Sequence, residues 1–213
     1  MMEPTELRER IQLRLMDALS DEKLHTRAPP LQELLERYLQ RPAKLLRPRL
    51  LLAAAEAYRP EGAPLPDDAL FELATASELL HVFAIMHDDL LDASGRPGLG
   101  FQPEKEGAAM RLLGGDLLHS VALEMIRRCV VTHALSPEIP ELVYDLSIKT
   151  ISGQGMEIAR STGGDTISQI GDLYELYDLK TGYYSFVAPL TIGFLTVRGG
   201  SDAPPPFSDG GEI

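Results

Sequence analysis

The segment His87-Asp88-Asp89-Leu90-Leu91-Asp92 places three carboxylates at the end of an otherwise apolar stretch. Asp88 and Asp92 are four residues apart, so on a helix they lie on one face. Two unit charges about 4 Å apart repel each other by about 4 kcal/mol at an effective dielectric constant near 20, and the C-terminal end of the helix dipole also disfavours acids. Oxygen ligands without Cys or paired His favour Mg²⁺ over zinc, and Mg²⁺ completes its shell with water and substrate phosphate. The spacing therefore indicates Asp88, Asp89 and Asp92 as a candidate magnesium site for a phosphate-bearing ligand, with a solvated acidic helix end as the alternative.

A phosphate-bearing ligand needs cations, and the segment Lys44-Leu45-Leu46-Arg47-Pro48-Arg49 supplies them. Lys44 and Arg47 are three residues apart at the expected start of a helix, where the helix dipole also favours an anion. Taken alone, this pair is more typical of a solvated basic turn than of an anion site.

Three further residues precede the aspartates on the same expected helix. His81 lies seven residues before Asp88 and so nearly on its face, while Phe83 and Ala84 lie one turn before the aspartates and could line an apolar channel. An ordinary place in the core is the alternative for each of them.

The elements that must position these residues are helices. Apolar residues recur at helical spacing almost throughout, with little strand signal, and Pro and Gly separate the segments. The expected helices cover residues 6–19, 31–38, 44–58, 67–91, 108–133, 141–161, 167–179 and 181–197. We predict one all-α domain of long helices over residues 1–198, followed at 199–213 by a Gly/Pro-rich loop and the start of a further helix.

Composition narrows the classes of function. The 213 residues carry 32 Asp and Glu against 20 Lys and Arg, a formal net charge of −12, which argues against a nucleic-acid partner. The single cysteine, Cys129, fits a reducing compartment, so we expect a cytoplasmic location. We expect no signal peptide, and the longest uncharged stretch, 181–197, is expected to be a buried helix instead of a membrane span.

Taken in order, these motifs resemble the trans-isoprenyl diphosphate synthases, the polyprenyl synthetase family. The resemblance rests on Lys-x-x-Arg-Pro from Lys44, Leu-Leu-His ending at His81, the HDDLLD segment, Gly-Gly-Asp-Leu-Leu from 114, and Lys180-Thr181-Gly. It extends from about residue 40 to residue 197. It implies a bundle of long, mostly antiparallel helices around a central apolar cavity.

The resemblance also implies roles for individual residues. Asp88 and Asp92, with Asp89 adjacent, match the ligands of Mg²⁺ that grips an allylic diphosphate, and Gln154, Lys180 and Thr181 match residues near that diphosphate and the developing carbocation. Other matching positions contact isopentenyl diphosphate or a diphosphate group: Lys44, Arg47, His81 and Arg96. Phe83, with Ala84 beside it, matches the position that limits chain length, and its bulk suits a product of about C15 to C20. The expected activity is condensation of isopentenyl diphosphate with an allylic diphosphate, by a homodimer.

The chain departs from the family pattern at several positions. Pro97 and Leu45 stand where basic residues are usual, and Glu157 stands where the family has Asp. The sequence ends where a second Asp-rich motif would follow, so we expect incomplete metal binding and little turnover from these 213 residues alone. The alternatives are an accessory homologue that binds a prenyl diphosphate without catalysis, and a terpene cyclase-like enzyme that needs no isopentenyl diphosphate.

Overall fold

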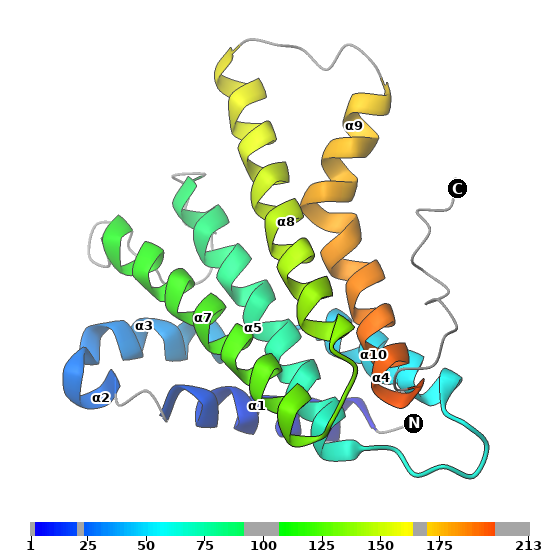
Figure 1. The fold of residues 1–213 in the computed structure, drawn as a ribbon. Helices are drawn as coiled ribbons and strands as arrows, with labels where there is room; N and C mark the ends of the chain where they lie inside the picture. Colours follow the sequence, from blue (N-terminus) through cyan, green and yellow to red (C-terminus); the bar gives the residue numbers. More distant parts are fainter. Residues whose placement is uncertain (1–2, 21–23, 92–106, 164–169, 199–213) are drawn as a thin grey trace. The chain divides into compact units, whose positions relative to one another are not determined.

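The computed structural model describes residues 3–20, 24–91, 107–163 and 170–198, and within these ranges every regular element is a helix (Figure 1). The predicted all-α class is confirmed. The chain divides into two compact units that alternate along the sequence: unit 1 is Met1–Leu45 with Phe71–Ile126, and unit 2 is Leu46–Leu70 with Arg127–Ile213. The prediction of one domain over residues 1–198 stays a prediction.

Unit 1 begins with three helices, α1 (Pro4–Ser20), α2 (Leu24–Arg27) and α3 (Pro29–Leu39). The predicted apolar stripe of α1 is buried along its whole length, at Leu7, Ile11, Leu15 and Leu19. Such burial contributes about 1.5–3 kcal/mol for each leucine or isoleucine side chain. The stripe therefore anchors α1 in the core of unit 1.

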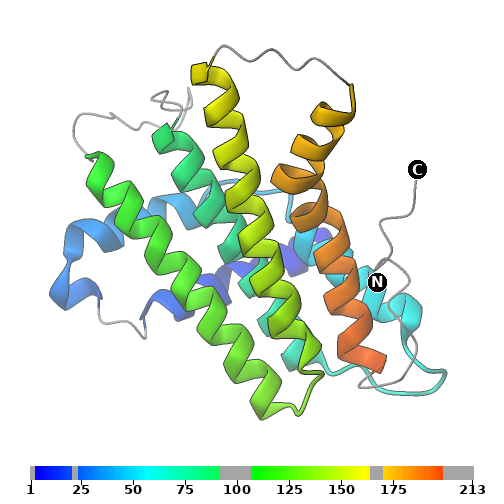
Figure 2. The same ribbon diagram turned by 45° about the horizontal axis from the view of Figure 1, so that its top comes forward.

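Two long helices complete unit 1, α5 (Asp67–Leu91) from Phe71 onward and α7 (Ala108–Thr132) as far as Ile126. They run side by side in Figures 1 and 2. Their close approach depends on two glycines: a Cβ on Gly114 would lie 2.7 Å from Cε of Met86, and a Cβ on Gly115 would lie 2.4 Å from the His87 ring. The Gly114-Gly115 pair thus lets the aspartate-bearing end of α5 pack directly on α7.

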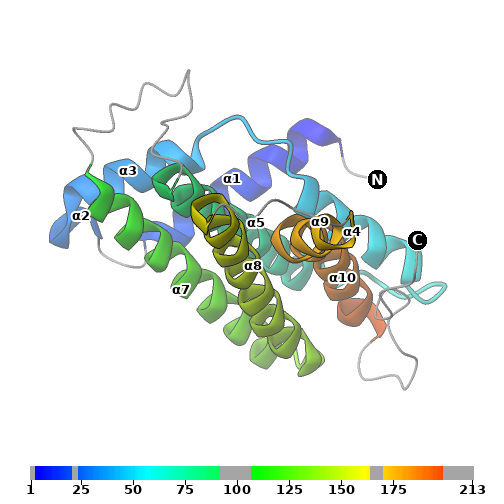
Figure 3. The same ribbon diagram turned by 90° about the horizontal axis from the view of Figure 1, so that it is seen from above.

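Unit 2 contains α4 (Leu46–Tyr58), α8 (Glu138–Gly163), α9 (Ile170–Tyr177), the π-helix η1 (Asp178–Val187) and α10 (Ala188–Arg198). Figure 3 shows α10 beside α4. The two helices touch at Gly193, where an added Cβ would lie 2.2 Å from the Leu51 carbonyl oxygen. This contact fixes the end of the helical run that begins at Ile170.

Several predicted boundaries were wrong, two of them at prolines. Pro30 and Pro140 lie inside the first turns of α3 and α8, where a missing N–H costs little, instead of between helices. The third predicted helix begins at Leu46, two residues late, and Pro48 lies in its first turn. The helix predicted over residues 67–91 has the bounds of α5, and α2 was not predicted.

The largest difference from prediction lies between residues 170 and 198, where two separate helices were expected. The structure has one continuous helical run whose middle, η1, is wound as a π-helix, and the Ala188 N–H donates to the Tyr183 carbonyl five residues back. Pro189 follows directly and lacks the N–H that a regular α-helix would use there. π-Winding is rare and is frequently found at functional sites.

One described helix, Asp67–Leu91, is long and apolar enough to cross a membrane by length and composition alone. Of its most apolar 18-residue window, 72% is buried inside the molecule, a property that the core helices of soluble proteins share.

Candidate functional site

The two described aspartates at the end of α5 differ sharply in their surroundings. Asp88 is half-buried, whereas Asp89 is 4% exposed. The Tyr38 hydroxyl donates to Oδ2 of Asp89 at 3.2 Å, and Nη1 of Arg41 lies 3.9 Å from the same oxygen. Burial and the neighbouring Asp89 raise the pKa of Tyr38 to about 12, so its hydroxyl keeps the donated proton at neutral pH. Asp89 is therefore held by the protein itself, and its role as a metal ligand stays a prediction.

Arg111, on α7, belongs to the same buried polar region. It is 5% exposed, its positive charge acts on Tyr38, and its Nη2 is buried without a hydrogen-bond partner. A fully buried arginine is rare without paired charge; here Arg41 lies beside Asp89, and the charge of Arg111 acts on the Tyr38 that donates to Asp89. Sequence analysis missed this group, although an arginine at the start of an apolar helical pattern was a usable signal.

Phe83 lies one turn before the aspartates, and its ring is flanked by two imidazoles. It is buried, with ring centroids 4.8 Å from that of His87 and 4.7 Å from that of His119. Nε2 of His87 lies 3.5 Å from Oδ1 of Asp116. Burial lowers the pKa of His119, so that imidazole is neutral at pH 7. The predicted chain-length residue thus belongs to a packed aromatic group, and Ala84 beside it is half-buried.

The remaining predicted residues of unit 1 are partly described. His81 is half-buried on α5, and Lys44 is exposed, followed by Leu45 with a positive φ of 51°. Asp92 and Arg96 lie outside the described residues.

Arg47 is the most unusual charged residue of unit 2. It is 8% exposed, its Nη2 donates to Oγ of Ser185 at 2.6 Å, and its guanidinium lies 4.5 Å from the centre of the Tyr184 ring. Its Nε is buried without a hydrogen-bond partner. No carboxylate among the described residues pairs with it. A guanidinium is always charged, and burying a charge with neutral neighbours is costly unless an anion arrives. The surroundings of Arg47 are therefore those of an anion-binding group.

Lys180 and Thr181 lie in η1, against α8. The Lys180 ammonium forms an ion pair with Glu157, and a Cβ on Gly153 would lie 2.7 Å from the Lys180 backbone nitrogen. Gln154 is half-buried next to that contact, and Thr181 is exposed. The Glu157 carboxylate, a departure from the family pattern, thus reaches the lysine that the sequence assigned to the diphosphate.

The structure sorts the predicted residues into two groups. Unit 1 carries the described aspartates with His81, Phe83, Ala84 and Lys44, and unit 2 carries Arg47, Gln154, Lys180 and Thr181. Within unit 2, η1 contacts both α4 and α8. Its Ser185 accepts a hydrogen bond from Arg47 of α4, and its Lys180 forms an ion pair with Glu157 of α8. The predicted proximity of Lys44 and Arg47 stays a prediction, because they belong to different units.

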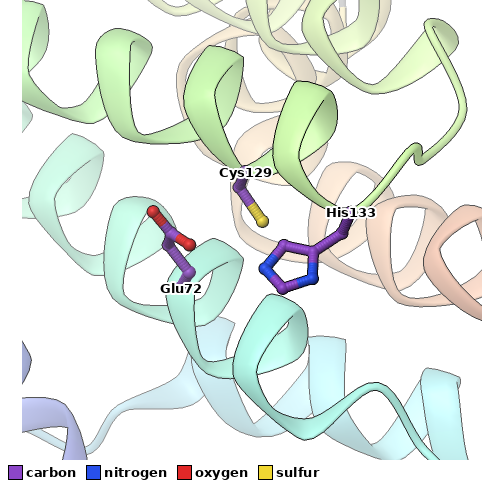
Figure 4. Close-up of side chains that lie close together, drawn as sticks. All are labelled: Glu72, Cys129 and His133. Atoms are coloured by element: carbon purple, nitrogen blue, oxygen red, sulfur yellow. The ribbon is translucent and has the colours of Figure 1, made fainter.

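Cys129 lies near the end of α7, one turn before His133 (Figure 4). The thiol is fully buried, with Sγ 3.6 Å from the Ala69 carbonyl oxygen. A buried cysteine of this kind packs as a small apolar side chain.

The amino-acid sequence is similar to those of known proteins. Residues 28–205 match the family model for polyprenyl synthetase. The chain is 36% identical over 115 residues to a geranylgeranyl diphosphate synthase of Methanosarcina mazei, covering 53% of this chain and 34% of the relative. It is 31% identical over 163 residues to a geranylgeranyl diphosphate synthase of Cereibacter sphaeroides, covering 75% and 52%.

Solved structures agree on the fold. A geranylgeranyl pyrophosphate synthase of Lactobacillus brevis superimposes with a TM-score of 0.76 at 17% identity, covering 91% of this chain and 56% of that one. An FPP/GFPP synthase of Zymomonas mobilis superimposes with a TM-score of 0.72 at 24% identity, covering 93% of this chain and 71% of that one. The chain spans about a third of the Methanosarcina relative and half of the Cereibacter one. With its family match over most of its length, the chain belongs to the polyprenyl synthetase family of trans-isoprenyl diphosphate synthases.

Proposed function

We propose that this chain belongs to a prenyltransferase that condenses isopentenyl diphosphate with an allylic diphosphate to a trans-prenyl diphosphate of about C15 to C20. The observation that carries the proposal is the buried Arg47 guanidinium, whose described hydrogen bond and ring contact are with the neutral Ser185 and Tyr184. A diphosphate supplies the missing negative charge. The names of the relatives, geranylgeranyl and farnesyl diphosphate synthases, support the substrate class.

The described residues supply part of the ligand set that a divalent metal would need. Asp88 offers carboxylate oxygens, the hard ligands that Mg²⁺ prefers, whereas Oδ2 of Asp89 already receives the Tyr38 hydroxyl. Asp88 would hold the ion together with Asp92, and Mg²⁺ would stabilise charge on the leaving diphosphate.

The protein's own residues supply the remaining chemistry. Arg47 binds and orients a diphosphate, and Lys180, paired with Glu157 in the ligand-free chain, exchanges that carboxylate for the leaving diphosphate. As the allylic C–O bond breaks, its electron pair stays with the diphosphate. The alkene of isopentenyl diphosphate then forms the new C–C bond and a proton is lost. Buried apolar side chains such as Phe83 exclude water from the carbocation.

The test measures products directly. The full-length protein is incubated with Mg²⁺, isopentenyl diphosphate and a C5, C10 or C15 allylic diphosphate, and products are identified by mass spectrometry. Elongated prenyl diphosphates support the proposal. Products that form equally well without isopentenyl diphosphate would instead support a terpene cyclase-like enzyme, and diphosphate binding without turnover would support an accessory homologue.

Arg47→Met, compared with Arg49→Met, tests the residue that carries the proposal. Arg49 lies two residues along the same helix and is exposed. Losing a charge-assisted hydrogen bond costs about 1.5–3 kcal/mol, which corresponds to a dissociation constant for diphosphate about 10 to 150 times higher. We expect that loss in Arg47→Met alone; equal affinities in the two variants would contradict the assignment.

We also propose that the protein forms a homodimer through α8. Tyr144, Ile148, Ile151 and Ile158 recur at helical spacing and are exposed by 52%, 65%, 56% and 37%. A contiguous apolar stripe of this kind is unusual on a free surface, and a second copy of the chain would cover it.

A further inference from the structure

Three side chains outside the predicted site form a compact group between α8 and η1. Nζ of Lys149 lies 2.8 Å from Oδ2 of Asp145, and the same nitrogen lies 3.8 Å from the centre of the Tyr183 ring. Beyond the effect of burial, the Asp145 carboxylate also acts on the Tyr183 phenol and raises its pKa. Lys149 therefore joins Asp145 and Tyr183 in a triangle of carboxylate, ammonium and phenol.

This triangle continues along one face of α8. Asp145, Lys149, Gly153 and Glu157 are spaced by four residues, and each meets η1: the first two at Tyr183, the last two at Lys180. α8 thus contacts the π-helix at three successive positions along this face: the triangle, the Gly153 backbone contact and the Lys180–Glu157 ion pair.

The electrostatics agree with this geometry. Burial and the Asp145 hydrogen bond raise the pKa of Tyr183, so the phenol stays a donor. Partial desolvation raises the pKa of Asp145, but the hydrogen bonds from Lys149 and Tyr183 outweigh it and leave the pKa below its ordinary value. Because Asp145 and Lys149 are half-exposed, their ion pair alone would contribute little to the stability of the fold. The contact of Lys149 with the Tyr183 ring ties this pair to η1.

We propose that Asp145, Lys149 and Tyr183 are positioning residues that fix the winding of η1 and thereby place Lys180 and Thr181 for the diphosphate. This inference rests on the proposed function. A π-helix is rarely stable by its own winding, so tertiary contacts must hold it, and a displacement of about 1 Å at a reacting group can lower a rate about a hundredfold.

The first test uses hydrogen exchange of the ligand-free chain and does not depend on activity. Tyr183→Phe removes the hydroxyl and Lys149→Met removes the ammonium, while Tyr174→Phe removes an exposed hydroxyl from α9 as a control. We expect amide exchange within residues 178–187 to accelerate about fivefold or more in the first two variants, with α10 and the Tyr174→Phe control within about twofold of the parent chain. Acceleration spread evenly over both units, or none, would overturn the proposal.

The second test measures the binding of inorganic diphosphate with Mg²⁺ by calorimetry. We expect a dissociation constant about fivefold or more higher in Lys149→Met and a value near that of the parent chain in Lys149→Arg, which keeps the cation. Faster exchange with unchanged diphosphate affinity would show a purely structural group and would also overturn the positioning role. Failure of the parent chain to bind diphosphate would instead refute the proposed function, whatever the exchange result.

Discussion

Gly153→Ala, compared with Gly155→Ala, is the sharpest test of how η1 is placed. Both glycines lie inside α8, two residues apart. A Cβ at 153 would lie 2.7 Å from the Lys180 nitrogen and 3.0 Å from the Leu179 carbonyl carbon, whereas a Cβ at 155 would have no neighbour within 4 Å. The two variants therefore share the same chemical change and differ in what the new methyl group meets.

The expected difference in unfolding free energy between the two variants follows from two opposing effects. Replacing glycine by alanine in a helix interior stabilises the folded state by about 1 kcal/mol at either position. At 153 the methyl group would lie about 0.7 Å inside the 3.4 Å lower limit of ordinary contact (3.4 − 2.7), and the obstacle is backbone. Overpacking of this kind costs about 1–3 kcal/mol. The unfolding free energies of the two variants should therefore differ by about 1–3 kcal/mol.

Thermal unfolding followed by circular dichroism measures this difference. For a chain of this size, 1 kcal/mol shifts the melting temperature by about 2–4 °C, so Gly155→Ala should melt about 2–12 °C above Gly153→Ala. Gly153→Ala should also bind diphosphate more weakly, because the Lys180 backbone must move. If the two variants melt together and bind equally, the close approach of η1 to α8 is refuted.

Three further predictions concern other residues. Phe83→Ala should lengthen the prenyl product, because it opens the buried aromatic group; an active enzyme with an unchanged product distribution would contradict the chain-length role. Asp145→Asn should lower the melting temperature slightly at pH 7, and the difference should shrink as the pH falls from the ordinary value of 3.8 through the lowered pKa of Asp145, because a carboxylate with a lowered pKa stabilises only while ionised; a difference that does not shrink with falling pH would exclude this cause. Ile148→Glu with Ile151→Glu should convert a dimer to a monomer in light scattering, and an unchanged mass would show that this stripe is not the interface.

Much of the fold could be predicted because helical periodicity is a local property. The stripe through Leu7, Ile11, Leu15 and Leu19 is buried as its spacing indicated, and the long helices around residues 67–91 and 108–132 were correctly placed. The starts of α3 and α8 were misplaced at Pro30 and Pro140, since a proline is tolerated in the first turn of a helix as readily as between helices.

The candidate site was less predictable, because its geometry depends on residues distant in sequence. Adjacent aspartates look equivalent in the sequence, yet Asp89 is held by Tyr38, 51 positions away, while Asp88 is half-buried. Arg47 pairs with Ser185 across 138 positions, and no local pattern announces that pairing.

The sequence by itself determined the all-α class, the order of the motifs and hence the family, because residue type and short-range spacing carry that information. Only the tertiary structure decided that residues 178–187 wind as a π-helix held by Asp145, Lys149 and Glu157, and that Arg47 is buried without an anion among its described neighbours. Burial, charge pairing and helix winding at these positions depend on which distant elements pack together, and that is settled by the free energy of the whole fold.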